Sequence, residues 1–350
     1  MKKLTTLTTA TVLTLGIFQS AAATELQIST WAGPNHGVNS IVWPTWGSWI
    51  EEATDGRVSV NVVHDMGPPG AQMELIADGV ADVTWLFHGL MPGRFELTKL
   101  PEFPTFKDFS SEAASVAYWR THQEYFADLN EHRGVEVIGL GVHGPGTLFL
   151  EEPIERLDEL PGNRVRIGGG VMADVSEALG LTGVALPPGN TYEAASQGVV
   201  DGAMLTQEGL KSFRLSEVLP NTVLMPGGFY RGSFSLVMNP DTLASLPEED
   251  REALLSVSGE RLSRLFGFMM DVVDGRGMAF AEEMGNTFIE LPQEEVDRFM
   301  TLVEDLPEQW AEAVAEKGVD GEAALEHFYE QLEEAGEEEG LTEDDLVEQG

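Results

Sequence analysis

The sequence predicts an α/β protein of two lobes, with one long helix that runs along both. Segments with strand-like alternation and segments with helical spacing follow each other through most of the chain, as in α/β sheets. The 350 residues exceed the length at which a single hydrophobic core stops growing, so we expect two lobes. The run 247–284 begins with a proline and contains no other. As a helix it would be about 55 Å long, more than one small lobe.

The N-terminus has the three parts of a cleavable secretory signal. Lys2 and Lys3 are followed by the uncharged stretch 4–18, and an alanine run ends at Ala23. The uncharged stretch is shorter than the ~20 residues that a membrane-spanning helix needs. We therefore predict a signal peptide over residues 1–23 and an exported protein without direct membrane anchoring. A retained N-terminal anchor is the alternative.

The charge balance limits the possible partners. Acidic residues outnumber basic ones 59 to 20, and only six of the bases are lysines. This balance excludes nucleic acid and an anionic membrane surface as partners. At about 1 M salt the Debye length falls to about 3 Å, so repulsion among carboxylates is tolerable in brine. We interpret the composition as that of a halophilic bacterium, with a generally acidic soluble protein as the alternative.

We expect the first lobe over residues 24–146, with a returning segment at 235–246. Period-two alternation predicts its strands, and apolar residues three to four apart, such as Trp46, Trp49 and Ile50, predict its helices. Its elements are expected as a strand at 26–31, a helix at 44–56, a strand at 58–63, a short helix at 68–79, a strand at 81–87, a helix at 111–130 and a strand at 135–140. Because strands and helices alternate, we expect mainly parallel strands.

We expect the second lobe over residues 147–234. Its elements are expected as strands at 147–151 and 164–167, helices at 171–179 and 191–197, a strand at 203–205 and a strand-like run at 230–238 that leads back. The long interlobe helix 247–284 starts with Pro247 and three acids, which favour a helix N-terminus. Residues 285–350 are expected to form C-terminal helices and an acidic tail that is solvated or frayed over 333–345.

Motifs for catalysis and cofactors are absent or out of context. Gly139, Gly141 and Gly144 match the dinucleotide fingerprint, but a strand-like segment follows them instead of the helix that would meet the pyrophosphate. The seven histidines lack metal-ligand spacing, no Gly-x-Ser-x-Gly is present, and the lack of cysteine excludes disulfides and thiolate sites. We therefore expect no cofactor, no metal and no enzyme; a lyase or hydrolase is the weaker alternative.

Aromatic and basic residues gather where predicted strands end. The residues concerned, all at or just beyond such ends, are Trp31, Trp85, Phe87, His88, His143 and Phe149. Open α/β sheets bind their ligands at these edges. Each residue taken alone has core packing as its alternative explanation. Together they indicate a ligand site lined with aromatic side chains.

Arg166 is the strongest single candidate for a ligand contact. Alternation along 164–167 places it on the same strand face as Arg164 and opposite the two aliphatic residues. A guanidinium can hold a carboxylate through two parallel hydrogen bonds, which lysine cannot do. We predict that Arg166 binds an anionic group, with a surface ion pair to one of the many acids as the alternative.

Several motifs resemble those of the solute-binding proteins of TRAP transporters (tripartite ATP-independent periplasmic transporters). Their positions are 92–95, 100–104, 143–146, 153–154, 157–162, 164–167, 178–180, 187, 192–194 and 197–202. The resemblance is collinear from about residue 25 to 285, and the run Gln197-Gly198-Val199-Val200-Asp201-Gly202 is its most specific part.

The resemblance implies a two-lobed periplasmic binding protein fold with crossing strands between the lobes. It also implies a solute in the cleft, closure of the lobes over it, and delivery to membrane permease subunits by an ion gradient without ATP. Arg166 matches the arginine that in this family usually pairs with a substrate carboxylate. The expected location is the periplasm.

Two departures from the family pattern bear on the ligand. Leu205 stands where many members have an asparagine that contacts ligand, and a second carboxylate-binding arginine is absent near His143. We therefore expect a small monocarboxylate with an aromatic or apolar body against Phe149 and Trp85, rather than a C4-dicarboxylate. The expected ligand contacts are Arg166, Phe149, His143, Trp85, His88, Trp31, Leu205, Gln207 and Tyr230. An ABC-importer receptor, or a receptor for a zwitterionic or cationic solute, remains the alternative.

Overall fold

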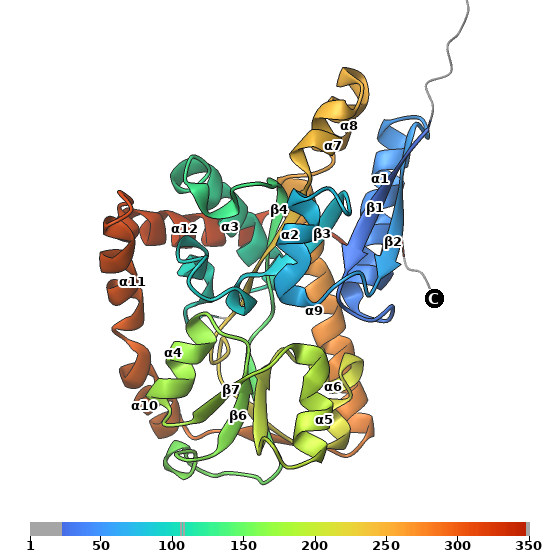
Figure 1. The fold of residues 1–350 in the computed structure, drawn as a ribbon. Helices are drawn as coiled ribbons and strands as arrows, with labels where there is room; N and C mark the ends of the chain where they lie inside the picture. Colours follow the sequence, from blue (N-terminus) through green and yellow to red (C-terminus); the bar gives the residue numbers. More distant parts are fainter. Residues whose placement is uncertain (1–22, 106, 108, 348–350) are drawn as a thin grey trace, which may run out of the picture.

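The protein consists of two α/β lobes, each built around its own sheet, as the computed structural model shows (Figure 1). The structure describes residues 23–105, 107 and 109–347. The predicted signal peptide lies outside the described residues except for Ala23. The two-lobed α/β class predicted from the sequence is confirmed.

The first lobe contains a five-stranded sheet in the order β2-β1-β3-β10-β4. Its strands are β2 (Val58–His64), β1 (Thr24–Thr30), β3 (Val83–Phe87), β10 (Ser233–Met238) and β4 (Glu136–Val142). β1 pairs in parallel with β2 and β3, whereas β10 is antiparallel to both β3 and β4. Its helices are α1 (Trp43–Ala53), α2 (Gln72–Ala77) and α3 (Ser111–Tyr125). The chain therefore completes this sheet with a strand that returns after the second lobe.

The second lobe contains a six-stranded sheet in the order β11-β9-β5-β8-β6-β7. Its strands are β11 (Thr287–Glu290), β9 (Asn221–Leu224), β5 (Thr147–Leu150), β8 (Gly202–Leu205), β6 (Arg164–Ile167) and β7 (Thr182–Ala185), and its helices are α4 (Val171–Ala178), α5 (Thr191–Ser196) and α6 (Gly209–Ser212). β5 is antiparallel to β8 and β9, and the other pairs are parallel. β11 lies beyond the predicted limits 147–234 of this lobe.

The prediction of mainly parallel strands therefore needs correction at the crossovers. β5 and β10 each come directly after an extended segment that crosses from one lobe to the other, and each is antiparallel to both of its neighbouring strands. The two passages lie side by side: the Gly146 amide donates to the Tyr230 carbonyl at 2.8 Å, and the His143 amide donates to the Gly232 carbonyl at 3.1 Å. These hydrogen bonds make a two-stranded connection between the lobes.

The single interlobe helix predicted over 247–284 is wrong, because the run is divided at Gly259. α8 (Glu248–Ser256) ends before it and α9 (Glu260–Glu283) starts after it. Gly259 has φ +63°, and its amide donates to the Ile138 carbonyl at 2.7 Å instead of continuing a helix. The 24-residue α9 alone contacts α3 and β4 in the first lobe and α6 in the second.

The first two C-terminal helices pass along the opposite side of the molecule from α9, and the last returns to α3 (Figure 1). α10 (Gln293–Val303) packs against α4, α11 (Leu306–Ala315) contacts the turn Leu97–Glu102, and α12 (Gly321–Glu337) packs against α3. The chain thus returns from the second lobe to the first. Among the helices that the structure describes, none is long and apolar enough to cross a membrane.

The acidic tail 333–345 is mostly exposed, as predicted, but it is not frayed. The Glu338 carboxylate binds Arg120 and Arg264, and α12 continues to Glu337. The Val347 amide donates to the Thr45 hydroxyl at 2.9 Å. The tail is held because its acids neutralise two partly buried arginines of α3 and α9, an arrangement that local composition does not reveal.

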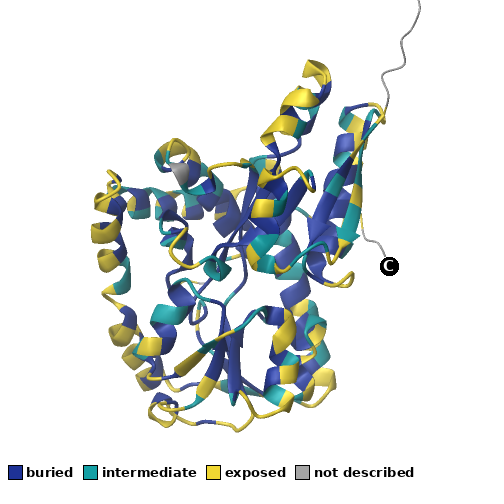
Figure 2. Ribbon diagram, in the orientation of Figure 1, coloured by how far each residue is buried: buried dark blue, intermediate teal, exposed yellow. Residues whose placement is uncertain are grey.

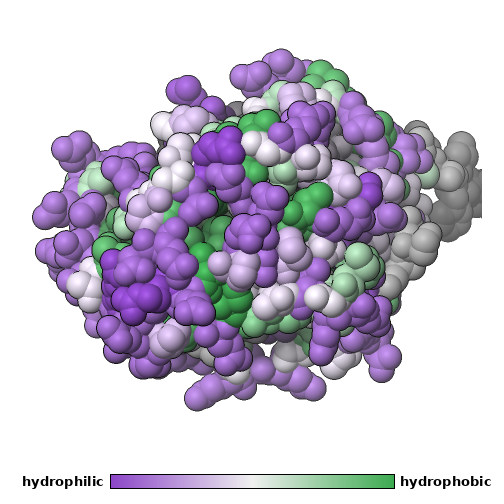
Figure 3. Space-filling model, turned by 90° about the horizontal axis from the view of Figure 1, so that it is seen from below, coloured by the Kyte–Doolittle hydropathy of each residue, from purple (hydrophilic) through white to green (hydrophobic). Residues whose placement is uncertain are grey.

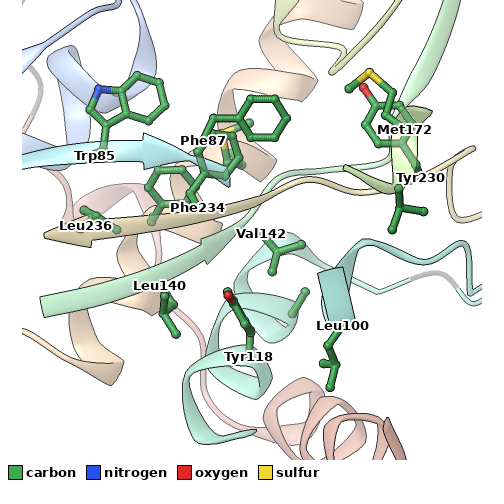
Figure 4. Packing of buried hydrophobic residues seen from close by; sticks show 14 of the residues in the cluster. Trp85, Phe87, Leu100, Tyr118, Leu140, Val142, Met172, Tyr230, Phe234 and Leu236 are labelled. Carbon is green, nitrogen blue, oxygen red and sulfur yellow. The ribbon is translucent and has the colours of Figure 1, made fainter. Parts of the chain in front are cut away.

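The core of the first lobe continues to the edge of the cleft between the lobes. Buried residues occupy both sheets, and exposed residues lie mainly on the outer helices (Figure 2). Trp85, Phe87 and Phe234 lie together on one side of β3 and β10, and Tyr118 of α3 lies on the other (Figure 4). The face seen from below is covered mainly by hydrophilic side chains, with apolar ones in a hollow near its centre (Figure 3). Aromatic core residues therefore reach the place where the lobes meet.

Candidate ligand-binding site

A small cavity lies between the two lobes. The first lobe, the crossing segments, the second lobe and α9 all contribute to its walls. The lining residues are Trp31, His36, Trp85, Phe87, His143, Arg166, Met172, Pro188, Leu205, Thr206, Glu208, Phe213, Tyr230, Phe234 and Met270. A mostly apolar cavity with a few polar groups is typical of a small-molecule site.

Arg166 is 0% exposed and comes from an inner strand of the second sheet, since β6 pairs with β7 and β8. Its Nε donates to the Leu186 carbonyl at 2.9 Å and its Nη1 to the Met204 carbonyl at 3.0 Å. These two bonds fix the plane of the guanidinium. Its Nη2 is buried and has no hydrogen-bond partner among the described residues. Burial lowers the pKa of Arg166 to about 10, so the group remains charged at neutral pH but lacks an anionic partner.

Arg164 lies on the same strand and forms a surface ion pair. A pair of this kind was the alternative explanation for Arg166. Its Nη2 lies 2.5 Å from Asp201 Oδ1, and both side chains are partly exposed. The two arginines therefore differ in role although they share a strand face. The exposed start of β6 holds Arg164, and the buried part directs Arg166 to the cavity.

The apolar walls consist of stacked aromatic rings from the first lobe. The Trp31 and Trp85 ring centroids are 4.0 Å apart with an interplanar angle of 15°. Both indole N–H groups are already used, Trp31 Nε1 on the Trp85 carbonyl and Trp85 Nε1 on the Thr30 hydroxyl. Phe234 continues the wall, with its ring centroid 5.7 Å from that of Trp85 and 5.1 Å from that of Phe87. These rings offer apolar surface to a ligand without competing donors.

The crossing segments contribute Tyr230 and His143. Their rings meet edge to face, with the centroids 5.3 Å apart. The Tyr230 hydroxyl is buried and finds no hydrogen-bond partner within the described part of the chain. His143 Nδ1 donates to the Gly144 carbonyl at 2.6 Å, which leaves its Nε2 as an acceptor. Burial lowers the pKa of His143 to about 3, so it stays neutral and supplies no second positive charge.

His36 and Glu208 meet across the cleft. His36 follows β1 in the first lobe, Glu208 follows β8 in the second, and His36 Nε2 lies 3.3 Å from Glu208 Oε2. Burial is the main cause that lowers the pKa of His36, against the opposing effect of Glu208. The second carboxyl oxygen of Glu208, Oε1, is buried without a hydrogen-bond partner among the residues described. This polar pair is therefore only half satisfied.

The lobes also meet beside the cavity. Glu102 of the first lobe accepts a hydrogen bond from the backbone amide of Val171 at 2.9 Å, and Lys99 Nζ lies 3.8 Å from Asp174 Oδ2. Both partners are on α4 of the second lobe. The structure thus has the lobes in contact around the cavity.

Of the residues predicted from the sequence, Arg166, His143, Trp85, Trp31, Leu205 and Tyr230 line this cavity, and three others do not. Phe149 packs into the second lobe's own core opposite Ala203, because its strand face points away from the cleft. His88 lies deeper, with its ring nitrogens on the Ser233 and Ser235 hydroxyls. Gln207 lies between two lining residues, and its backbone packs against Gly277 of α9.

Sequence reasoning missed eight lining residues: His36, Met172, Pro188, Thr206, Glu208, Phe213, Phe234 and Met270. Glu208 is a direct neighbour of the predicted Gln207, so a wider window there would have included it. Phe87, named among the strand-end residues, also lines the cavity. Phe213 and Met270 lie on segments that carry no local signal of a ligand. Only the packing of α6 and α9 brings them to the cleft.

Comparison with known proteins agrees with this geometry. The family model "Bacterial extracellular solute-binding protein, family 7" matches residues 29–317. A TRAP periplasmic solute binding protein from Bordetella bronchiseptica, solved with (R)- and (S)-mandelate, has a TM-score of 0.85 and 32% identity, with coverage of 89% of this chain and 99% of that one.

Two further relatives extend the comparison. A TRAP solute binding protein from Rhodoferax ferrireducens, solved with copurified benzoate, has a TM-score of 0.83 and 26% identity, with coverage of 89% of this chain and 98% of that one. "Outer membrane transporter protein TsaT" of Comamonas testosteroni is 29% identical over 327 residues, which are 92% of this chain and 95% of TsaT. The resemblance noted in the sequence is confirmed: the chain belongs to the family 7 bacterial extracellular solute-binding proteins, which serve TRAP transporters.

Proposed function

We propose that this protein is the periplasmic receptor of a TRAP transporter and that it binds a small aromatic monocarboxylate between its lobes. The observation that carries the proposal is Arg166 Nη2, a buried charged donor in an apolar cavity that lacks a partner within the described residues. Buried charges are stable only when paired, so the site favours an anion at this atom. Relatives that hold mandelate and benzoate support an aromatic acid.

The cavity offers a positive charge for one ligand carboxylate, not for two. Among the described residues that line it, Arg166 is the only one with a permanent positive charge. His143 is neutral, and Leu205 stands where an asparagine would offer a polar contact. A second carboxylate would be buried unpaired, at a cost of several kcal/mol. An aromatic ring, in contrast, would lie against Trp85, Phe87 and Phe234.

The mechanism of ligand capture follows from the position of the cavity, whose walls belong to different lobes. A ligand that touches Arg166 on β6 and the rings on β3 and β10 gains its full contact only when the lobes are together. It therefore shifts the open–closed balance toward closure by its differential affinity for the closed state. The closed form presents a surface that membrane permease subunits would recognise, and the protein itself carries out no chemistry. Secretion would use the predicted signal over residues 1–23.

The test is calorimetric titration of the purified protein with mandelate and benzoate. Arg166→Ala should weaken binding by about 2–5 kcal/mol, because the ligand carboxylate would be buried without its partner. Arg164→Ala is the matched control, on the same strand but paired at the surface, and should leave affinity unchanged. Small-angle scattering should show a smaller radius of gyration on saturation. Equal affinity of wild type and Arg166→Ala would refute the assignment.

A further inference from the structure

Besides Arg166 Nη2 and the Tyr230 hydroxyl, the cavity lining contains an unsatisfied carboxylate, that of Glu208. Glu208 is 4% exposed, lines the cavity, and its Oε1 has no hydrogen-bond partner in the described structure. A buried acceptor without a donor is unfavourable, and native proteins keep such groups rarely and often for function. The atom lies in the same apolar cavity as the ligand proposed above.

The neighbours of Glu208 hold it in place. The Val38 amide donates to His36 Nδ1 at 3.2 Å, so the proton of the neutral ring is on Nε2, which faces Glu208 Oε2 at 3.3 Å. The backbone amide of Glu208 donates to Asp274 Oδ1 of α9 at 2.6 Å. One carboxyl oxygen is therefore used by His36, and the other is left for the cavity.

We propose that Glu208 Oε1 accepts a hydrogen bond from a donor group on the ligand, a hydroxyl or an amino group, while Arg166 binds the ligand's carboxylate. The inference rests on the proposed function and narrows it to aromatic monocarboxylates that carry such a donor. Sites built to hydrogen-bond a ligand group discriminate strongly against analogues without it, because their own buried polar atoms are then left unpaired.

The same arrangement couples recognition to closure. Glu208 is on the second lobe, whereas its partner His36 is on the first, where the ring stands 5.0 Å from Trp85. A donor bound at Oε1 would therefore be enclosed between Glu208 and the aromatic wall of the opposite lobe. A ligand without the donor would still reach Arg166 but would leave Glu208 half satisfied on closure.

The experiment uses two pairs of acids that differ only by one hydroxyl, mandelate with phenylacetate and 3-hydroxybenzoate with benzoate. Titration of the full-length mature protein should show at least one hydroxy acid binding about tenfold tighter than its partner, equivalent to ~1.4 kcal/mol. Glu208→Met removes the acceptor at similar volume and should reduce this ratio to near one. Glu217→Met, an exposed glutamate of the same lobe, should preserve it.

The outcomes separate this inference from the proposed function. If neither acid of either pair binds the wild type, the proposed function fails. If both members of each pair bind equally, or if the preference survives in Glu208→Met, only the role of Glu208 fails. Glu208→Leu provides a second variant without an acceptor should the methionine substitution prevent folding, and the same loss of preference is expected. Phenylglycine identifies the donor: tighter binding than mandelate assigns a charged amino group, and weaker binding assigns a hydroxyl.

Discussion

The carboxylate of Glu102, in the first lobe, accepts a hydrogen bond from the backbone amide of Val171, the first residue of α4 in the second lobe, at 2.9 Å. Its other oxygen accepts from the amide and hydroxyl of Ser233 at the start of β10. One buried side chain therefore connects both lobes and a crossing strand. Because the contact crosses the cleft, it belongs to the state in which the lobes are together.

This contact predicts a pH-dependent stability. Burial raises the pKa of Glu102 from 4.5 to about 7, against the opposing hydrogen bonds. A carboxyl whose pKa is higher in the folded than in the unfolded protein stabilises the fold fully at pH below its unfolded-state pKa. This stabilisation is lost as pH rises through the folded-state pKa. The free energy of unfolding of wild type relative to Glu102→Gln should therefore fall by up to about 3 kcal/mol between pH 4.5 and 7.5.

Denaturant titrations of both proteins across this pH range measure the difference. Glu74→Gln, an exposed glutamate on α2, is the control and should show no such trend. A constant difference between wild type and Glu102→Gln would mean that the pKa of Glu102 is the same in the folded and the unfolded protein.

The ligand class gives a second prediction. Mandelate or benzoate should bind at least about tenfold tighter than succinate, a difference of ~1.4 kcal/mol. Succinate would bring a second carboxylate into a cavity where Arg166 is the one permanently charged base among the described lining residues and where Glu208 would repel it. Competition titrations measure the ratio. Tighter binding of succinate or malate than of every monocarboxylate tested would contradict the single-carboxylate site.

The acidic composition gives a third prediction. With 59 acids and 20 bases, exposed carboxylates repel each other, and molar salt should screen this repulsion. The melting temperature should therefore rise from dilute buffer to molar sodium chloride. Potassium chloride should act equally if screening is the cause. A melting temperature that stays flat or falls would count against the halophilic interpretation.

The crossing segments give a fourth prediction. A Cβ at Gly146 would overlap the Tyr230 ring and lie 2.6 Å from the Tyr230 carbonyl oxygen. Gly146→Ala should destabilise the protein by about 1–3 kcal/mol and weaken ligand binding, because Tyr230 lines the cavity. Gly189→Ala is the control, since among the described atoms nothing lies within 4 Å of its added methyl. Chemical denaturation and calorimetry measure the two effects, and unchanged stability would show that the connection can adjust.

Strands with clear alternation and helices with strong apolar spacing could be predicted from the sequence to within a few residues. The predicted strand 58–63 is β2 (Val58–His64), and the predicted helix 171–179 is α4 (Val171–Ala178). β7, β9 and β11, of four residues each, were missed, whereas β5, β6 and β8 of the same length were predicted, so short length alone does not explain the difference. The break at Gly259 was missed because it depends on a hydrogen bond to Ile138, far along the chain.

By itself, the sequence determined that Arg164 and Arg166 share one face of a strand, because side chains alternate along any strand. Only the tertiary structure decided that Arg164 pairs with Asp201 at the surface while Arg166 lies buried beside a cavity. The same holds for His36 and Glu208, which come from different lobes and meet across the cleft. Periodicity is a property of neighbouring residues, whereas burial and charge pairing depend on which distant segments pack together, and that is set by the fold as a whole.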